Sequence, residues 1–185
     1  MHTGSATGGT HSPLVGVFSR RCLSMADTRP WEVSTSTDTG WNQVIDGMVT
    51  TQFYGLDKRP GASAYVGGTQ DNGTWLSPLD PVALTPWADV IGGDGYETSW
   101  HFDDPLKIIG GYQYNGLQRS LDGGRSWSPA ITAVSPPGEI DHGGGSAPFI
   151  TKIAKSQSAP DFLCAVGVQG VWRSSDFGGT WSLCA

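Results

Sequence analysis

Two stretches of the chain share one turn motif. Residues 119–127 read Arg-Ser-Leu-Asp-Gly-Gly-Arg-Ser-Trp, and residues 173–181 read Arg-Ser-Ser-Asp-Phe-Gly-Gly-Thr-Trp, so both follow Ser-x-Asp-x-Gly-x-(Ser/Thr)-Trp. An Asp carboxylate can accept backbone N–H bonds of its own turn, and Gly tolerates the positive φ at which the chain reverses. The Trp offers a large apolar face to the returning strand. The motif therefore predicts a tight β-hairpin, and its recurrence predicts a repeat architecture.

A longer repeat surrounds this turn motif. An apolar strand, a turn that carries Gln and Gly, and a second strand recur in three segments, namely residues 65–77, 108–120 and 164–174. Their turn glycines, Gly73, Gly116 and Gly170, are 43 and 54 residues apart. That period fits one four-stranded blade of a β-propeller. Asn72-Gly73 and Asn115-Gly116 are also strong two-residue hairpin signals.

The composition favours an all-β domain. The 185 residues suffice for one domain with a core, and 27 Gly, 12 Pro and 8 Trp with only 15% charged residues indicate short strands and many turns. The formal net charge of −6 and the lack of a basic cluster argue against a nucleic acid partner. No apolar run approaches the length of a membrane span.

The repeats divide the chain into blades, each with strands A to D in chain order. The expected blades are about residues 50–92, 93–133 and 146–185, with a partial blade at 33–49, and their A strands are expected at about Thr50–Leu56, Tyr96–Phe102 and Phe149–Lys155. Residues 36–41 are a degenerate turn motif, and residues 1–32 are predicted to be irregular, with a remnant strand near Leu14–Phe18. Propellers close with four to eight blades. We therefore predict three to four blades of an incomplete propeller, which pairs with missing blades or a second chain; a degenerate four-bladed ring is the alternative.

The pattern resembles the Asp-box, or BNR-repeat, β-propellers, the superfamily of sialidases, xyloglucanases and sortilin-like proteins. The resemblance covers about Val33 to the end and is carried by the turn motifs and by Gln52–Tyr54, Gly67–Gly73 and Gly92–Gly95. The pattern looks like that of bacterial BNR-repeat proteins described as glycosyl hydrolase-like. This resemblance implies a propeller fold. It implies no catalytic residues, because the Arg-Ile-Pro motif of sialidases is missing and no local motif of xyloglucanases matches.

Localisation and redox state are less constrained. The resemblance implies an extracellular or periplasmic protein, yet Met1–Pro13 lacks the apolar core of a signal peptide. Either the protein is intracellular or this chain lacks its natural beginning. Cys164 and Cys184 are expected on strands B and D of one blade, roughly 9–10 Å apart, which is too far for a disulfide. The third cysteine is Cys22.

Blade topology separates structural acids from candidate functional ones. The A–B and C–D connections of a four-stranded blade lie on one face, which we call the C–D face, and the B–C and D–A connections lie on the opposite B–C face. The turn motifs are C–D hairpins, so we expect their acids to cap turns and not to act as catalysts. The residues with this predicted structural role are Ser120, Asp122, Gly124, Trp127, Ser174, Asp176, Gly178 and Trp181.

The B–C face gathers polar, acidic and aromatic residues, a mixture that suits a sugar or peptide ligand. The candidate ligand-binding residues are Gln70, Asp71, Asn72, Asp94, Tyr96, Gln113, Tyr114, Asn115, His142 and Gln169. Glycosidases need two carboxylates roughly 5–9.5 Å apart. The candidate catalytic acids are Asp71, Asp94, Glu97, Asp141 and the nearby Glu139, and the sequence fixes no pair among them.

Simpler interpretations stay open for the same residues. Asp71–Gly73 forms a good turn whatever its function, and the glycines of Gly92–Gly95 suit tight backbone, although this segment could also bind Ca²⁺. His101 is interpreted as an ordinary strand residue, and we expect neither a metal nor a cofactor. Two functions remain: a binding or scaffold propeller whose B–C face meets a glycan or peptide, and part of a glycoside hydrolase that uses paired carboxylates.

Overall fold

The computed structural model describes residues 31–33, 41–43, 51–134 and 138–184. It forms two compact units, Met1–Thr50 and Thr51–Ala185. In the first unit, β1 (Trp31–Val33) and β2 (Trp41–Gln43) pair antiparallel, with Val33 opposite Trp41. These strands flank the degenerate turn motif, whose own residues 36–40 lie outside the described residues, as does the remnant strand predicted at Leu14–Phe18.

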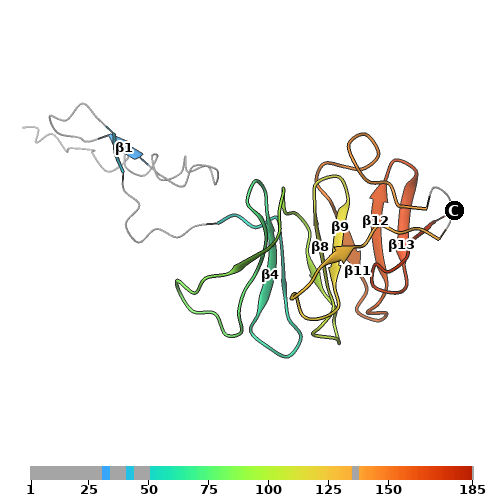
Figure 1. The fold of residues 1–185 in the computed structure, drawn as a ribbon, viewed down its shortest axis with the longest axis horizontal. Coiled ribbons are helices and arrows are strands. Elements are labelled where there is room, and N and C mark those ends of the chain that lie inside the picture. The colour runs from blue at the N-terminus through green and yellow to red at the C-terminus, as the bar shows by residue number, and fades with distance from the viewer. Residues whose placement is uncertain (1–30, 34–40, 44–50, 135–137, 185) are drawn as a thin grey trace, which may run out of the picture. The chain divides into compact units, whose positions relative to one another are not determined.

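The second unit consists of three four-stranded antiparallel sheets (Figure 1). The first blade contains β3 (Gly55–Lys58), β4 (Tyr65–Thr69), β5 (Gly73–Leu76) and β6 (Ala88–Ile91). The second contains β7 (Ser99–Trp100), β8 (Ile108–Tyr112), β9 (Gly116–Ser120) and β10 (Ser128–Pro129). The third contains β11 (Ile153–Lys155), β12 (Leu163–Gly167), β13 (Gly170–Ser174) and β14 (Ser182–Leu183).

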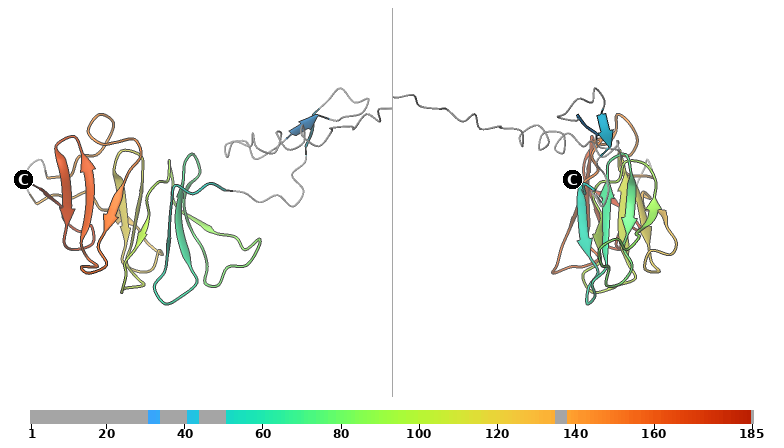
Figure 2. Two further views of the ribbon diagram at one scale, coloured as in Figure 1. Left: turned by 180° about the vertical axis from the view of Figure 1, so that it is seen from behind. Right: turned by 90° about the vertical axis from the view of Figure 1, so that its left-hand side faces the viewer.

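This arrangement confirms the predicted fold class. In every sheet the strand order follows the chain order, and no helix occurs among the described residues. The three blades stand side by side in an open row and do not close a ring (Figures 1 and 2). Within the described part of the chain, no helix is long and apolar enough to cross a membrane.

The A strands begin later than predicted, because the residues before them serve as interblade connections. β7 starts at Ser99, whereas the sequence predicted a strand from Tyr96. The backbone of Tyr96 instead lies directly against Gly68 of the first blade: a Cβ at Gly68 would stand 2.2 Å from the Tyr96 carbonyl oxygen. Gly95 N donates to Thr69 O at 3.0 Å. Glycine in β4 thus lets the connection approach the first blade.

The core lies between the blades and uses the turn-motif tryptophan. Between the second and third blades, Ile109 and Leu117 pack with Trp172, Phe177 and Trp181, all at most 1% exposed. Burial of each such side chain contributes about 1.5–3 kcal/mol. A smaller cluster that includes Val66, Trp100 and Ile108 joins the first and second blades. Interblade packing is therefore the main source of stability that the structure shows.

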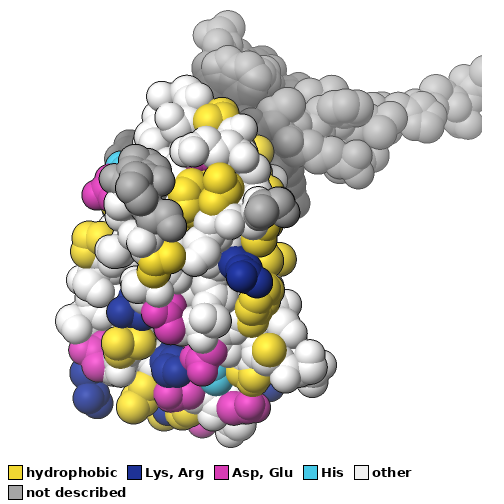
Figure 3. Space-filling model, turned by 90° about the vertical axis from the view of Figure 1, so that its right-hand side faces the viewer, with side chains coloured by type: hydrophobic (Ala, Val, Ile, Leu, Met, Phe, Trp, Pro, Cys, Tyr) yellow, Lys and Arg dark blue, Asp and Glu magenta, His cyan; other side chains and the backbone are white. Residues whose placement is uncertain are grey.

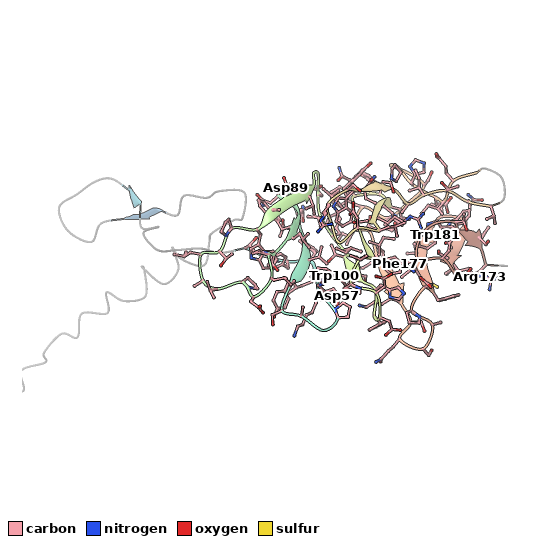
Figure 4. The ribbon with its side chains drawn as sticks, turned by 60° about the horizontal axis from the view of Figure 1, so that its bottom comes forward. Asp57, Asp89, Trp100, Arg173, Phe177 and Trp181 are labelled. Atoms are coloured by element: carbon pink, nitrogen blue, oxygen red, sulfur yellow. The ribbon has the colours of Figure 1, made fainter. Side chains whose placement is uncertain are left out.

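An ion pair links the A strands of all three blades. Lys155 of β11 donates to the carboxylate of Asp57 in β3, and it also donates to the Trp100 carbonyl of β7 at 3.1 Å. Trp100 N donates to the same Asp57 carboxylate at 2.7 Å (Figure 4). Lys155 also lies 4.2 Å from the centre of the Phe102 ring. These contacts fix the blades relative to one another.

The outer side of the third blade is exposed. Val166 and Val171 face each other across β12 and β13 and are 43% and 41% exposed. Figure 3 looks onto this blade and shows hydrophobic side chains interspersed with charged ones. Cys164 and Cys184 of this blade are free cysteines. Pairing of this blade with a further blade or a second chain stays a prediction.

Candidate functional site

The first turn motif is held by its own aspartate. Asp122 Oδ1 accepts the N–H groups of Arg125 at 3.0 Å and Ser126 at 2.9 Å, and Oδ2 accepts the Ser126 hydroxyl at 2.6 Å. The Ser120 hydroxyl donates to Oδ1 at 2.7 Å and accepts Gly124 N at 2.8 Å. The bonds from Ser126, above all from its hydroxyl, hold the pKa of Asp122 far below its ordinary value.

The second turn motif repeats this geometry. Asp176 Oδ1 accepts Thr180 N at 2.8 Å and the Ser174 hydroxyl at 2.7 Å, and Oδ2 accepts the Thr180 hydroxyl at 2.9 Å. Burial tends to raise the pKa of Asp176, but the bonds from Thr180 and Ser174 outweigh it and the pKa is lowered. In both hairpins the carboxylate is thus committed to its own turn.

Asp141 on the B–C face is equally committed. It is 5% exposed, and its Oδ2 accepts Gln169 N at 2.7 Å and the Trp172 indole N–H at 3.2 Å. Its Oδ1 accepts the Gln169 side-chain amide at 2.6 Å. Burial tends to raise the pKa of Asp141, but the Gln169 and Trp172 donors outweigh it and the pKa is lowered. Asp141 therefore joins the loop before the third blade to the B–C turn of that blade.

Asn115 lies inside the protein and not at its surface. It is fully buried, with a positive φ of 55°. Its side-chain amide donates to the carbonyls of Asp141 at 2.9 Å and Val166 at 2.7 Å, and its own N–H donates to the Thr151 hydroxyl at 2.9 Å. Asn115 is thus part of the same junction between the second and third blades.

Asp71 and Asp94 are brought together at the first blade. Asp71, in the αL region at φ 62°, donates its N–H to Asp94 Oδ1 at 2.9 Å. Asp94 N donates to Gln113 Oε1 at 3.1 Å. The exposed Asp71 carboxylate accepts no hydrogen bond from any described residue, and neither does Asp94 Oδ2. These oxygens can therefore accept bonds from a ligand.

A hollow of about 530 Å³ opens beside these two acids. It is lined by the first B–C turn, the following D–A loop and two strand residues, namely Asp71, Asn72, Gly73, Trp75, Asp89, Gly92, Gly93 and Asp94. Trp75 is half-buried and its indole N–H donates to Asn72 O at 2.6 Å. Asp89 lies opposite Trp75 on the outer strand β6 (Figure 4), and its carboxylate accepts no bond from a described residue.

The sequence did not predict Trp75 and Asp89 as residues of the candidate site. Reading register outward from the Asn72-Gly73 turn would have placed Trp75 near that turn, but the pairing with Asp89 was not foreseeable. A loop, residues 77–87, separates the two strands in the sequence, and the register shifts between Thr74 and Trp75.

The predicted aromatic residues Tyr96 and Tyr114 belong to a packed row that also contains Tyr54 and Phe149. Tyr96 makes edge-to-face contacts with Tyr54 at 5.2 Å and with Phe149 at 5.6 Å between ring centres, and Phe149 contacts Tyr114 at 5.2 Å. Tyr96 is fully buried, and its hydroxyl has no hydrogen-bond partner among the described residues. Burial, followed by the charge of Asp94, raises the pKa of Tyr96 to about 12. The Tyr54 hydroxyl donates to Gln70 Oε1 at 2.8 Å.

The remaining acids lie in ion pairs. Glu97 pairs with Lys152 at 3.1 Å, and Glu139 Oε2 lies within hydrogen-bond distance of His142 Nε2, at 2.7 Å. His101 is buried, and its Nδ1 accepts the N–H groups of Asp103 and Asp104 in the A–B turn. Among the residues with described side chains, no group of three or more His, Cys, Asp or Glu is arranged to hold a metal ion.

Comparison with known proteins bears on the fold alone. No family model matches the chain, and no curated protein matches it. A crystal structure of an ancestral GH74 enzyme, a glycoside hydrolase with a β-propeller fold, matches 78% of the chain with a TM-score of 0.57 and 16% sequence identity. The chain spans only 20% of that enzyme's length. This likeness supports a β-propeller fold.

Proposed function

We propose that the B–C face of the first blade binds a carbohydrate. The observation that carries this proposal is the hollow in which Asp71, Asp89 and Trp75 lie together. Carboxylates without a protein donor are strong acceptors for sugar hydroxyls, because bonds to an ionised group are short and strong. A half-buried indole offers an apolar face to the C–H side of a sugar ring.

The polar groups elsewhere on this face fit a ligand less well. Asp141 and Asn115 hold the second and third blades together, and Glu97 pairs with Lys152. The Asp141 carboxylate, the Asn115 side-chain N–H groups and one Glu97 oxygen already have protein partners, so a ligand would have to displace those bonds. We therefore place the ligand at the first blade rather than across the whole face.

A second candidate function is glycoside hydrolysis with Asp71 and Asp94 as the carboxylate pair. Two observations favour it: the bond from Asp71 N to Asp94 Oδ1 keeps the two residues adjacent, and the fold is similar to that of a glycoside hydrolase. Retaining enzymes hold their carboxyl groups about 5–5.5 Å apart and inverting enzymes about 6.5–9.5 Å. The Asp71 N–H bond keeps both acids at one hollow, and the separation of their carboxyl groups in the sugar complex would decide between the two mechanisms.

The test combines a glycan array with a panel of chromogenic glycosides. We expect Asp71→Asn to weaken glycan binding about tenfold, the loss of one charge-assisted hydrogen bond. Asp103→Asn is the matched control, because Asp103 is an exposed aspartate on the C–D face whose carboxylate also accepts no bond from a described residue. Glycan binding without turnover would exclude the hydrolase, and turnover lost in both Asp71→Asn and Asp94→Asn would support it. If the unmodified protein bound no glycan, the carbohydrate proposal would be wrong.

A further inference from the structure

A second hollow lies on the C–D face of the first blade. Its volume is about 550 Å³, and its lining includes Lys58, Arg59, Ser63, Leu79 and Asp80. One wall is the turn between β3 and β4, and the other is the loop that replaces the turn motif in this blade. Asp80 N donates to Ser63 O at 2.6 Å and fixes the two walls together.

The hollow contains two cations, Lys58 and Arg59, that have no anionic partner among the residues the structure describes. Arg59 is half-buried, and its Nε–H is enclosed without an acceptor. None of its five N–H donors bonds to another described residue, and the same holds for the Lys58 ammonium group. By contrast, Lys107 and Lys155 each reach an aspartate. The enclosed Nε–H is unfavourable without an acceptor, because it loses water without a replacement, and the terminal N–H groups of the guanidinium remain free to bond a ligand.

We infer that this hollow binds a small oxyanion, such as a phosphate, sulfate or carboxylate group. The planar guanidinium of Arg59 can bind two oxygens of such a group at once, and Lys58 adds a second positive charge. The Ser63 hydroxyl supplies a further donor at the same wall. Asp80 opposes any anion there, so it limits the affinity. This site lies on the face opposite the proposed carbohydrate site and does not depend on it.

The role of Asp80 makes the inference testable in both directions. We expect Arg59→Gln to weaken binding of inorganic phosphate at least about tenfold, as loss of a bidentate charged partner does. We expect Asp80→Asn to tighten it about threefold, since a like charge near the anion is removed. Arg125→Gln is the matched control: Arg125 is an exposed arginine whose guanidinium also bonds to no described residue, and its loss should change nothing.

The measurement is a titration of the whole chain with phosphate and with sulfate, followed by NMR. Glucose 6-phosphate and glucose then identify the source of the anion: equal affinity for phosphate and glucose 6-phosphate indicates a free ion, and tighter binding of the sugar phosphate indicates a sugar-borne group. The inference is overturned if no anion saturates the site below about 20 mM, a dissociation constant that corresponds to only about 2 kcal/mol of binding free energy. It is also overturned if Arg125→Gln weakens binding as much as Arg59→Gln, or if Asp80→Asn leaves binding unchanged.

Discussion

Replacement of Asp141 by Ala should destabilise the protein strongly, although Asp141 is one of the candidate catalytic acids. Its carboxylate accepts three hydrogen bonds, two from Gln169 and one from the Trp172 indole. Gln169 is exposed, so its side-chain amide can turn to water. Trp172 is 1% exposed and would keep an unsatisfied N–H in the core. A lost bond to a charged group costs about 1.5–3 kcal/mol and an unsatisfied buried donor about 1–3 kcal/mol, so we expect a total near 3 kcal/mol.

The assay is thermal unfolding followed by circular dichroism. A loss of about 3 kcal/mol corresponds to a melting temperature lower by about 10 °C in a domain of this size. Asp71→Asn is the control, since the exposed Asp71 carboxylate accepts no bond from a described residue, Asn tolerates the positive φ of this position, and the change should cost less than about 0.5 kcal/mol. If Asp141→Ala melted like the unmodified protein but lost ligand binding or turnover, Asp141 would be a functional acid and the reasoning would be refuted.

The pH dependence gives an independent check on Asp141. Its pKa is lowered in the folded protein, so the folded state favours the ionised form more than the unfolded state does. The resulting stabilisation is complete above the unfolded pKa of about 3.9 and disappears as the pH falls through the lower folded pKa. The difference in stability between the unmodified protein and Asp141→Ala should therefore shrink in acid below about pH 4.

Three further predictions concern stability. Asp122→Ala should lower the melting temperature, because the carboxylate holds its turn through three donors from Arg125 and Ser126; an unchanged melting temperature would refute the capping role. Tyr96→Phe should leave stability unchanged or raise it by up to about 1 kcal/mol, because the buried hydroxyl bonds to no described residue, and a large loss would reveal a bond to this hydroxyl. Lys155→Met and Asp57→Asn should each cost about 2 kcal/mol, since both side chains are only about a fifth exposed, 21% and 23%. Their double variant should cost less than the sum, as measured by urea unfolding, and strict additivity would contradict the link.

The fold was largely predictable because its signals are local. Asn72-Gly73 and Asn115-Gly116 specify hairpins within a few residues, and the spacing of these turns specifies four strands a blade. The A strands were predicted too long, since close approach of Tyr96 to Gly68 depends on residues 28 positions apart.

The candidate site was less predictable than the fold. Whether a carboxylate is free to bind a ligand depends on hydrogen-bond donors that lie far away in the sequence. Asp141 and Asp71 look alike in the sequence, as acids in Gly-rich turns. Only the structure shows that Gln169 and Trp172 donate hydrogen bonds to the Asp141 carboxylate. The Asp71 carboxylate receives no bond from the described residues. Trp75 and Asp89 are paired on the neighbouring strands β5 and β6, which a loop separates in the sequence. No sequence motif therefore indicated that the two residues lie together.

The central claim, a carbohydrate at the hollow of the first blade, is tested most directly by the NMR signal of the Trp75 indole N–H. This group donates to Asn72 O at the edge of the hollow, whereas the Trp181 indole is buried between blades and donates to Ala130 O. On titration with a glycan that the array identifies, we predict a saturable shift of the Trp75 signal, with the Trp181 signal unchanged and the response lost in Asp71→Asn. Binding that leaves the Trp75 signal unmoved, or that persists undiminished in Asp71→Asn, would contradict the account.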